Sequence, residues 1–342
     1  MASACDTAYN IDDLRELARR RLPRAFFEFL DRGTEDEIAV ANNRAALQRI
    51  QLNARVLVDV RARSQQIELF GKRQEMPIAI SPTGVAGLLW HDGEVALARA
   101  ARKAGIPFSL ATTSVAALED VAERAGGRLW FQLYIWPERC FSFEMVERAK
   151  NAGVEALILT VDGVVSPNRE YNLRNGYSAP FRFTRRNVID VLMHPRWMIN
   201  TLGRYVAGGG MPQFMNYPQE VREKVTSRKI DRRTLINNPS LSWDDVRELR
   251  RVWPRTLIVK GIMNADDARQ AVALGADGVL AGRAPVYGVC AGGADGVERA
   301  LDILETEAFD ALGLLGARSL DELGPDLLVP AARPVVTETQ RA

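Results

Sequence analysis

The sequence predicts an α/β protein built as a parallel TIM (β/α)₈-type barrel that lacks about two of its eight βα units and carries additional N-terminal helices. Six short apolar runs recur along the 342 residues, and segments with helical spacing separate them. Apolar runs without polar alternation are typical of strands buried on both faces of a parallel sheet. Ala-Gly or Leu-Gly pairs stand shortly before several of these runs, as expected where a helix ends and a strand follows.

The chain begins with a helical region, which we expect over residues 10–49. Leu14, Leu17 and Ala18 share one face of a helix, and a phenylalanine cluster follows at residues 26–29. The six predicted strands come next, beginning at Pro77, Pro107, Leu129, Ala156, Thr256 and Gly278. A last helix is expected over residues 294–316. Because a barrel of this type closes with eight strands, two βα units are predicted to be absent between Ala271 and Leu280.

The longest interruption of this pattern covers residues 163–240, after the fourth strand. A connection of that length inside a compact domain is usually functional. We expect residues 1–342 to form a single domain in which 163–240 is a long excursion, either a lid over the barrel or a membrane-associating segment. Residues 185–215 of the excursion combine apolar side chains and Trp197 with flanking arginines, a composition that suits the surface of an anionic membrane.

Composition limits the function classes. The chain is 47% hydrophobic and has a net charge of only +2, which argues against a general nucleic-acid-binding protein. The positive charge is concentrated in residues 181–233, where eleven Lys or Arg stand against four Asp or Glu. The three cysteines have no CxxC spacing, so we expect neither a disulfide framework nor a metal site. No stretch approaches the length of a membrane-spanning helix, and the cell interior is the expected compartment.

Polar residues at the ends of predicted strands are the candidate site, because barrel chemistry occurs at that end. Lys260 ends the fifth strand, and Gly282 with Arg283 follows the sixth. The alternative for Lys260 is a salt bridge at the barrel mouth, although its place at a strand end favours a functional role. Gln132 and Tyr134 could simply close a strand with polar groups, and Thr83 and Thr160 could satisfy backbone groups. A glycine beside an arginine suits a phosphate, since glycine allows close approach and arginine supplies the opposite charge.

The ordered motifs resemble those of the FMN-dependent L-2-hydroxy-acid dehydrogenases and oxidases, in particular the bacterial L-lactate and (S)-mandelate dehydrogenases. The resemblance runs from Tyr9 to about Leu328. The matching stretches are RLPRAFFEFLDRGTEDE from Arg21, SPTGVAG from Ser81, FQLY from Phe131, LTVDGVVSPNRE from Leu159, HPRW from His194, NNPSLSW from Asn237, LIVKGI from Leu257 and GRAPVYG from Gly282.

The resemblance implies a role for each candidate residue. Backbone groups of Pro82, Thr83 and Gly84 would line the flavin edge. Gln132 and Thr160 would hydrogen-bond the pyrimidine part of the ring, and Lys260 would stabilise charge on the reduced flavin. Gly282 and Arg283 would hold the FMN phosphate. Tyr134 and Arg169 would bind the substrate, with Tyr134 and Lys260 as the catalytic residues that remain. A planar guanidinium such as that of Arg169 can bind a carboxylate through two hydrogen bonds.

The chain also departs from the family pattern. The family has an SNHGGRQLD-like segment, which carries the catalytic histidine and a carboxylate-binding arginine, and a DSGFRRG-like phosphate-binding segment. Both are missing here. DARQAV from Asp267 resembles the helix before the first segment, and ALGADGVLAGRAPVYG from Ala273 resembles the end of the next repeat. We therefore hypothesise an in-frame loss between two similar sequences. Phe29 also stands where relatives usually have a substrate-binding tyrosine, and neither His91 nor His194 is expected to replace the missing histidine.

The function predicted from the resemblance is oxidation of a small L-2-hydroxy acid to the 2-oxo acid by hydride transfer to FMN. A quinone or oxygen would accept the electrons. The expected protein is a homo-oligomer, cytoplasmic or peripheral on the inner face of the cytoplasmic membrane. Two alternatives remain at this point. One is a catalytically silent flavin- or membrane-binding homologue, and the other is a lyase that uses Lys260 to form a Schiff base.

Overall fold

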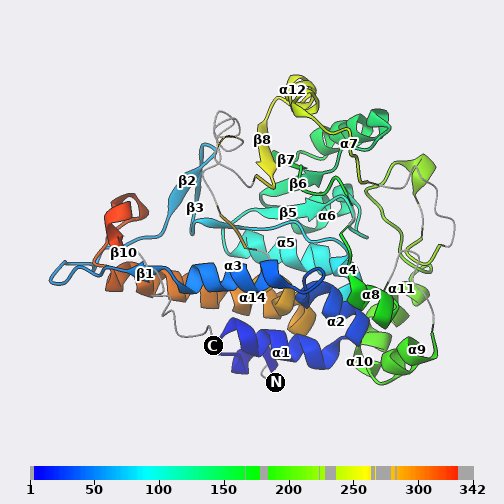
Figure 1. Cartoon of the computed structure of the whole chain (residues 1–342), viewed down its shortest axis with the longest axis horizontal. Coiled ribbons are helices and arrows are strands. Elements are labelled where there is room, and N and C mark those ends of the chain that lie inside the picture. Colours follow the sequence, from blue (N-terminus) through cyan, green and yellow to red (C-terminus); the bar gives the residue numbers. More distant parts are fainter. Residues whose placement is uncertain are drawn as a thin grey trace, which may run out of the picture.

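A computed structural model describes residues 4–165, 167–177, 184–222, 224–227, 236–262, 266, 279–281 and 283–329. Its centre is a curled, six-stranded parallel sheet with the strand order β8-β7-β6-β5-β4-β9 (Figure 1). The strands are β4 (Ile78–Ile80), β5 (Phe108–Ala111), β6 (Leu129–Leu133), β7 (Ala156–Thr160), β8 (Thr256–Lys260) and β9 (Val279–Ala281). All six predicted strands are confirmed. The sheet has the curvature and direction of part of a (β/α)₈ barrel.

The register divides the strand residues between an inner and an outer face. Trp130 pairs with Ala156, Gln132 with Ile158, and Thr160 with Lys260, so these residues lie on one face. On this inner face Trp130, Ala156 and Ile158 form a small apolar cluster with Leu69. Leu69 belongs to a hairpin of β2 (Ile67–Leu69) and β3 (Lys72–Gln74). The hairpin therefore covers the end of the inner face where the strands begin, and leaves their carboxyl ends to the site.

Helices cover the outer face, where the large core cluster lies. They are α4 (Ala86–Leu89), α5 (Gly93–Lys103), α6 (Leu118–Ala125), α7 (Arg139–Asn151) and α12 (Trp243–Val252). The start of α12 is specified locally. The Ser242 side chain accepts a hydrogen bond from the Asp244 amide, and the Asp245 carboxylate accepts one from the Ser242 amide. This reciprocal cap fixes the point where the excursion returns to the barrel.

Two N-terminal elements, η1 (Ala4–Thr7) and α1 (Ile11–Arg21), pack along the C-terminal helix α14 (Arg283–Leu314), below α5 in Figure 1. The helices α2 (Arg24–Asp31) and α3 (Ile38–Gln48) follow, and the Tyr287 hydroxyl of α14 donates to Asp31 of α2. The helix expected over 294–316 is the second of two pieces of α14, which meet at the non-helical Gly292 and Gly293. The first piece was not predicted. A Cβ on Gly288 would lie 2.2 Å from the Gly296 oxygen, so only glycine allows the two pieces to approach this closely.

Short elements complete the described chain. β1 (Gln51–Leu52) pairs antiparallel with β10 (Leu328–Val329). The 3₁₀ turns η5 (Leu320–Glu322) and η6 (Pro325–Leu327) precede β10 in the chain. The excursion forms α8 (Glu170–Asn175), α9 (Arg185–Leu192), α10 (Pro195–Trp197), the π-helical η2 (Met198–Gly203), α11 (Arg204–Ala207) and η3 (Gln219–Val221). Its helices α8 and α9 contact α2. Within the described ranges, none of the helices has the length and apolar character needed to cross a membrane.

Candidate functional site

The carboxyl ends of β6, β7 and β8 bring three of the predicted side chains onto one face. Gln132, Thr160 and Lys260 all belong to the inner face by register. Gln132 and Thr160 are 2% and 4% exposed. Among the protein atoms that the structure describes, Gln132 Nε2 and Thr160 Oγ1 have no hydrogen-bond partner. Since buried polar atoms are normally paired, these two atoms mark a place suited to a polar ligand.

Lys260 lies at the rim of this face. Its ammonium is 3.3 Å from the Asp162 carboxylate, and both side chains are partly exposed to solvent. The salt bridge considered from the sequence is therefore present. The Lys260 ammonium is the positive charge at the end of the inner face of this strand. A solvent-exposed pair of this kind contributes only about 0–1 kcal/mol to folding, so the ion pair does not by itself account for the position of the lysine.

Tyr134 follows β6 and lies close to the same rim. A Cβ on Gly163 would be 3.5 Å from its ring, and its pKa responds to both Asp162 and Arg169. Burial raises the pKa of the Tyr134 phenol, the Asp162 charge raises it further, and Arg169 opposes the change. The phenol consequently stays protonated near neutral pH and can donate a hydrogen bond.

Arg169, at the start of α8, completes this group from the excursion. Its guanidinium carbon lies 5.5 Å from the centre of the Phe29 ring, and Phe29 stacks on Tyr177 with centroids 4.6 Å apart. Phe29 thus provides an apolar wall beside the cation. The structure brings together Tyr134, Arg169 and Lys260, which the sequence placed in three separate segments.

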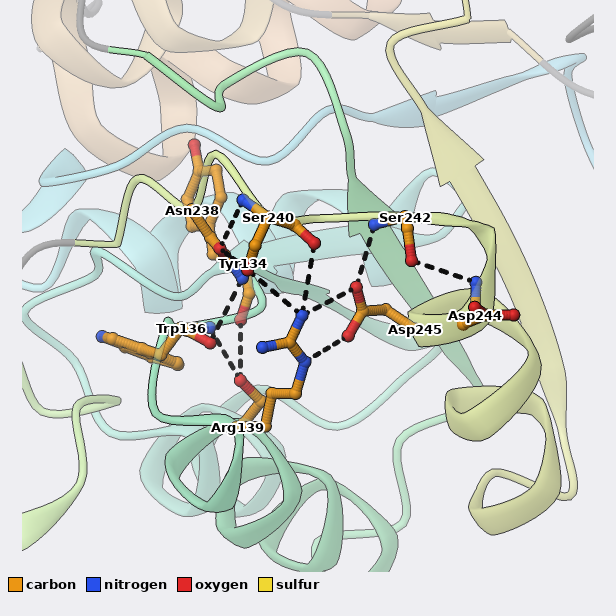
Figure 2. A network of polar contacts seen from close by, with 9 residues as sticks. Tyr134, Trp136, Arg139, Asn238, Ser240, Ser242, Asp244 and Asp245 are labelled. Carbon is orange, nitrogen blue, oxygen red and sulfur yellow. Dashed lines mark hydrogen bonds and ion pairs between the residues drawn. The ribbon is translucent and has the colours of Figure 1, made fainter.

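A network of polar contacts holds the loops that carry these residues (Figure 2). Arg139, at the start of α7, donates to both carboxylate oxygens of Asp245 in α12. Asn238 donates to the Trp136 carbonyl at 3.4 Å, and Ser142 joins the Trp136 amide to the Tyr134 carbonyl. The loop after β6 is therefore tied to the segment that precedes α12.

The network reaches one loop further. Asn237 donates to the Gly163 carbonyl at 2.7 Å, which connects the segment before α12 to the loop after β7. Burial alone would raise the pKa of Asp245, but hydrogen bonds from Arg139 and the Ser242 amide outweigh it and lower the pKa. Asp162, Arg139 and Asp245 were not among the site residues predicted from the sequence. Ser242, with an aspartate three residues later, is a local signal for the start of a helix.

The loop after β4 holds Pro82, Thr83 and Gly84, all partly exposed. A Cβ on Gly84 would lie 2.2 Å from Thr113 Oγ1, and the Val85 amide donates to the Thr113 carbonyl at 3.1 Å. The loops after β4 and β5 are therefore in close contact, and glycine is required at position 84 for steric reasons. Thr83 remains at the strand-end side, as predicted from the sequence.

The predicted phosphate position is only partly described. Gly282 lies outside the described residues. Arg283 opens α14, is exposed, and donates from Nε to the Leu30 carbonyl of α2 at 3.2 Å. Its neighbour on α2, Asp31, accepts hydrogen bonds from Arg15 and Tyr287. Arg283 thus contacts the N-terminal helix α2. Gln132, Thr160 and Lys260 instead lie at the ends of β6, β7 and β8, and Pro82, Thr83 and Gly84 follow β4.

The two histidines lie elsewhere. The His91 ring packs against Tyr205 of α11 with centroids 4.6 Å apart, and burial lowers its pKa. His194 Nδ1 is 2.7 Å from the Asp190 carbonyl, at the end of α9. Both contacts are with the excursion and its immediate surroundings, so neither ring occupies the place of a base beside Tyr134 and Lys260.

Comparison with known proteins assigns this architecture. A family model described as FMN-dependent dehydrogenase matches residues 18–280 and, separately, residues 269–330. The chain belongs to the FMN-dependent dehydrogenase family. The (S)-mandelate dehydrogenase of Pseudomonas putida is 34% identical over 380 aligned positions, which cover 94% of this chain and 93% of that protein. The L-lactate dehydrogenase of Chromohalobacter salexigens is also 34% identical, with 93% and 94% covered.

A solved structure extends the likeness to three dimensions. The crystal structure of the monotopic membrane protein (S)-mandelate dehydrogenase aligns with a TM-score of 0.87 and 33% identity, covering 95% of this chain and 100% of that one. The predicted family, barrel fold class and FMN cofactor are confirmed, and the protein is classed with the 2-hydroxy-acid dehydrogenases, which are oxidoreductases. The 380 aligned positions exceed the 342 residues of the chain, so the alignment contains gaps on the side of this chain.

Proposed function

We propose that this protein holds FMN at the carboxyl ends of its strands and binds an L-2-hydroxy acid of the lactate or mandelate type beside it. The observation that carries the proposal is the pair of buried, unpartnered atoms Gln132 Nε2 and Thr160 Oγ1 on the face that ends in Lys260. A flavin ring offers hydrogen-bonding groups along its pyrimidine edge, so the residues present fit this cofactor. When bound, FMN supplies the hydride acceptor.

The chain's own residues divide the remaining work. Arg169 binds the substrate carboxylate, and the protonated phenol of Tyr134 donates to the oxygen at the reacting carbon. Lys260 is a fixed positive charge at the strand end, which favours negative charge that develops nearby during the reaction. Pro82, Thr83 and Gly84 line the flavin edge, and Gly282 with Arg283 is the proposed phosphate position. Phe29 limits the pocket and removes one donor, which favours a substrate with an apolar side group.

Turnover by the chain is expected to be slow. The two family matches overlap at residues 269–280, as expected where two similar stretches have been joined with the sequence between them lost. A family member without its general base loses about 10² to 10⁴ in rate. We therefore propose a flavoprotein that retains cofactor and substrate binding but oxidises hydroxy acids weakly. A silent flavin-binding homologue is the limiting case of the same proposal.

The setting of the protein is proposed from the same relatives. Residues 1–342 act as one domain, and the excursion 163–240 attaches it peripherally to the inner face of the cytoplasmic membrane through residues 185–215. The exposed apolar side chains of Ile189, Met193 and Ile199 support this, since they would be shielded in a lipid surface. A quinone is the proposed electron acceptor in that setting, with oxygen as the alternative, and a homo-oligomer is the proposed assembly.

Absorption spectroscopy of the purified protein tests the function. We expect a yellow protein whose flavin is bleached slowly under anaerobic conditions by L-mandelate or L-lactate, and not by the D-enantiomers. A folded, colourless protein that does not take up added FMN would contradict the proposal. Flavin binding without any bleaching over hours would reduce the function to that of the silent homologue.

A further inference from the structure

An apolar cavity of about 260 Å³ lies between the excursion and the barrel. Val85 and Leu88 form its barrel side together with Phe26 of α2, and Val191, Leu202 and Phe214 form its excursion side. For comparison, an apolar cavity of about 150 Å³ binds benzene. The space is therefore large enough for part of a hydrocarbon chain.

Three polar side chains of its wall already have partners within the protein. Trp197 donates its indole N–H to the Leu88 carbonyl at 2.8 Å. Thr201 Oγ1 accepts a hydrogen bond from Arg21 at 3.3 Å, and the Tyr205 hydroxyl lies 3.5 Å from the Asp92 amide. A ligand with its own donors or acceptors would lose hydrogen bonds to water on entering and find few new ones. The wall thus selects an apolar occupant.

Two lining residues also connect the cavity to the outer surface. Val188 and Leu192, one turn apart on α9, line the cavity although they are 43% and 58% exposed. On the same helix Ile189 is 60% exposed, and Met193 just beyond its end is 74% exposed. The opening of the cavity consequently lies among exposed apolar side chains, a setting from which an apolar chain can enter without crossing a polar surface.

The barrel side of the cavity reaches the flavin-edge loop. Val85 lines the cavity and directly follows Gly84, the last of the three residues proposed to lie along the flavin. An occupant whose chain fills the cavity would therefore have its other end beside the site. We propose that this cavity binds the hydrocarbon tail of a membrane-soluble quinone and guides its ring toward the flavin edge. The inference rests on the proposed function and assigns the acceptor a place.

Binding to the full-length protein tests the inference without turnover. The probes are a benzoquinone with a decyl tail, the same ring with a methyl group, and decanol, titrated while tryptophan fluorescence is recorded. Trp197 lies in the cavity wall, and quinone rings quench indole fluorescence at short range. We expect the decyl quinone to bind at least about tenfold more tightly than the methyl quinone. Equal affinities, or displacement of the decyl quinone by decanol at the same concentration, would overturn the proposal.

Two variants locate the binding. Leu202→Trp fills the cavity and should weaken decyl quinone binding about tenfold. Asn200→Trp adds the same side chain on the same π-helical segment at an exposed residue that does not line the cavity, and should leave binding unchanged. Equal losses in both variants would contradict the assignment. If Leu202→Trp does not fold, Val191→Phe is the second cavity-filling variant, and the tail-length comparison on the unchanged chain decides independently.

The outcomes also separate this inference from the proposed function. If the protein takes up FMN and is bleached by L-mandelate but shows no preference for the decyl tail, the quinone cavity is contradicted and the proposed function is supported. If binding depends on the tail but the protein takes up no FMN, the proposed function is contradicted. The cavity would then bind a hydrocarbon chain without serving electron transfer, which also overturns the assignment to an acceptor.

Discussion

The two halves of the strand-end rim differ in how completely they are built. From β4 to β8 the loops are joined to one another by Thr113, Asn237 and the pair Arg139–Asp245, and they hold buried polar atoms without protein partners at Gln132 and Thr160. The proposed loss of a histidine-bearing family segment lies between β8 and β9, and Arg283 donates to the Leu30 carbonyl. The proposed function therefore places the binding residues on one half of the barrel and the loss of the catalytic base on the other.

The difference also shows what maintains each half. The complete half is fixed by contacts between loops, each of which follows an intact strand. In the other half, Arg283 contacts α2. Under the proposed function, binding and proton transfer are separated within one chain, and the following experiments test this separation.

Restoring the missing segment should have the largest effect. We expect insertion of the corresponding residues of Pseudomonas putida (S)-mandelate dehydrogenase between Val272 and Ala273 to raise the rate of flavin reduction by about 10² to 10⁴, because a general base returns to the site. Anaerobic stopped-flow absorption with L-mandelate measures this rate. The same insert with its histidine changed to alanine is the control, and an equal rate from both inserts would show that the base is not what the chain lacks.

Lys260→Met should have the next largest effect, measured in the chain that carries the inserted segment. We expect flavin reduction to slow by about 10²-fold, since a charge that stabilises the transition state is removed. The free energy of unfolding should change by less than about 1 kcal/mol, because the ion pair with Asp162 is partly exposed. Asp162→Asn breaks the same ion pair but keeps the cation. If it slows the reaction as much as Lys260→Met does, the salt bridge and not the charge at the strand end is what matters.

Removing the unpartnered polar atoms should weaken cofactor binding more moderately. Gln132→Leu and Thr160→Val are each expected to raise the Kd for FMN about tenfold. Thr160→Val should also stabilise the FMN-free protein by roughly 1 kcal/mol, because a buried hydroxyl without a partner is removed. Gln132→Leu should stabilise it less, because this change also removes the Oε1 that accepts a hydrogen bond from the Thr112 amide. FMN fluorescence titration and chemical denaturation measure the two quantities. Ser109→Ala is the matched control. Its hydroxyl is also buried without a partner among the described residues, but Ser109 pairs with Trp130, nearer the beginning of the strands, so FMN affinity should not change.

The smallest effect is expected at Glu94, a buried carboxyl outside the strand ends. Its Oε2 has no partner within the described part of the chain, and burial raises its pKa above the usual value. A group with a raised folded-state pKa contributes stability that is full below the unfolded pKa and is lost as pH rises through the folded pKa. Glu94→Gln should therefore raise the free energy of unfolding at pH 8 by about 1 kcal/mol and flatten its decline between pH 5 and pH 8.

Urea denaturation at both pH values measures that decline, and flavin affinity serves as the internal control. The affinity should stay unchanged in Glu94→Gln, in contrast to Gln132→Leu. A pH dependence identical to that of the unchanged chain would mean that Glu94 titrates normally. A loss of FMN binding would mean that the buried carboxyl supports the site. Glu94 would then not differ from Gln132 and Thr160 in its effect on the cofactor.

The sequence by itself determined the repeating units of this protein. Local periodicity and short stretches such as FQLY and LIVKGI predict the six strands, the N-terminal helices and the order of the site motifs. These features can be predicted because each depends on residues that are close together in the sequence. The proposed loss of the histidine segment likewise rests on the sequence alone. The first piece of α14 escaped prediction because glycines interrupt its pattern next to a strand.

Only the tertiary structure decided which distant residues meet. The ion pair Arg139–Asp245 joins residues more than a hundred positions apart, Arg283 binds a carbonyl of α2, and the cavity forms where α9 and η2 pack against the segment after β4. The physical reason is that such contacts depend on the direction in which each loop leaves the sheet and on the volume that the side chains leave unfilled. Neither quantity is encoded in any single stretch of the chain.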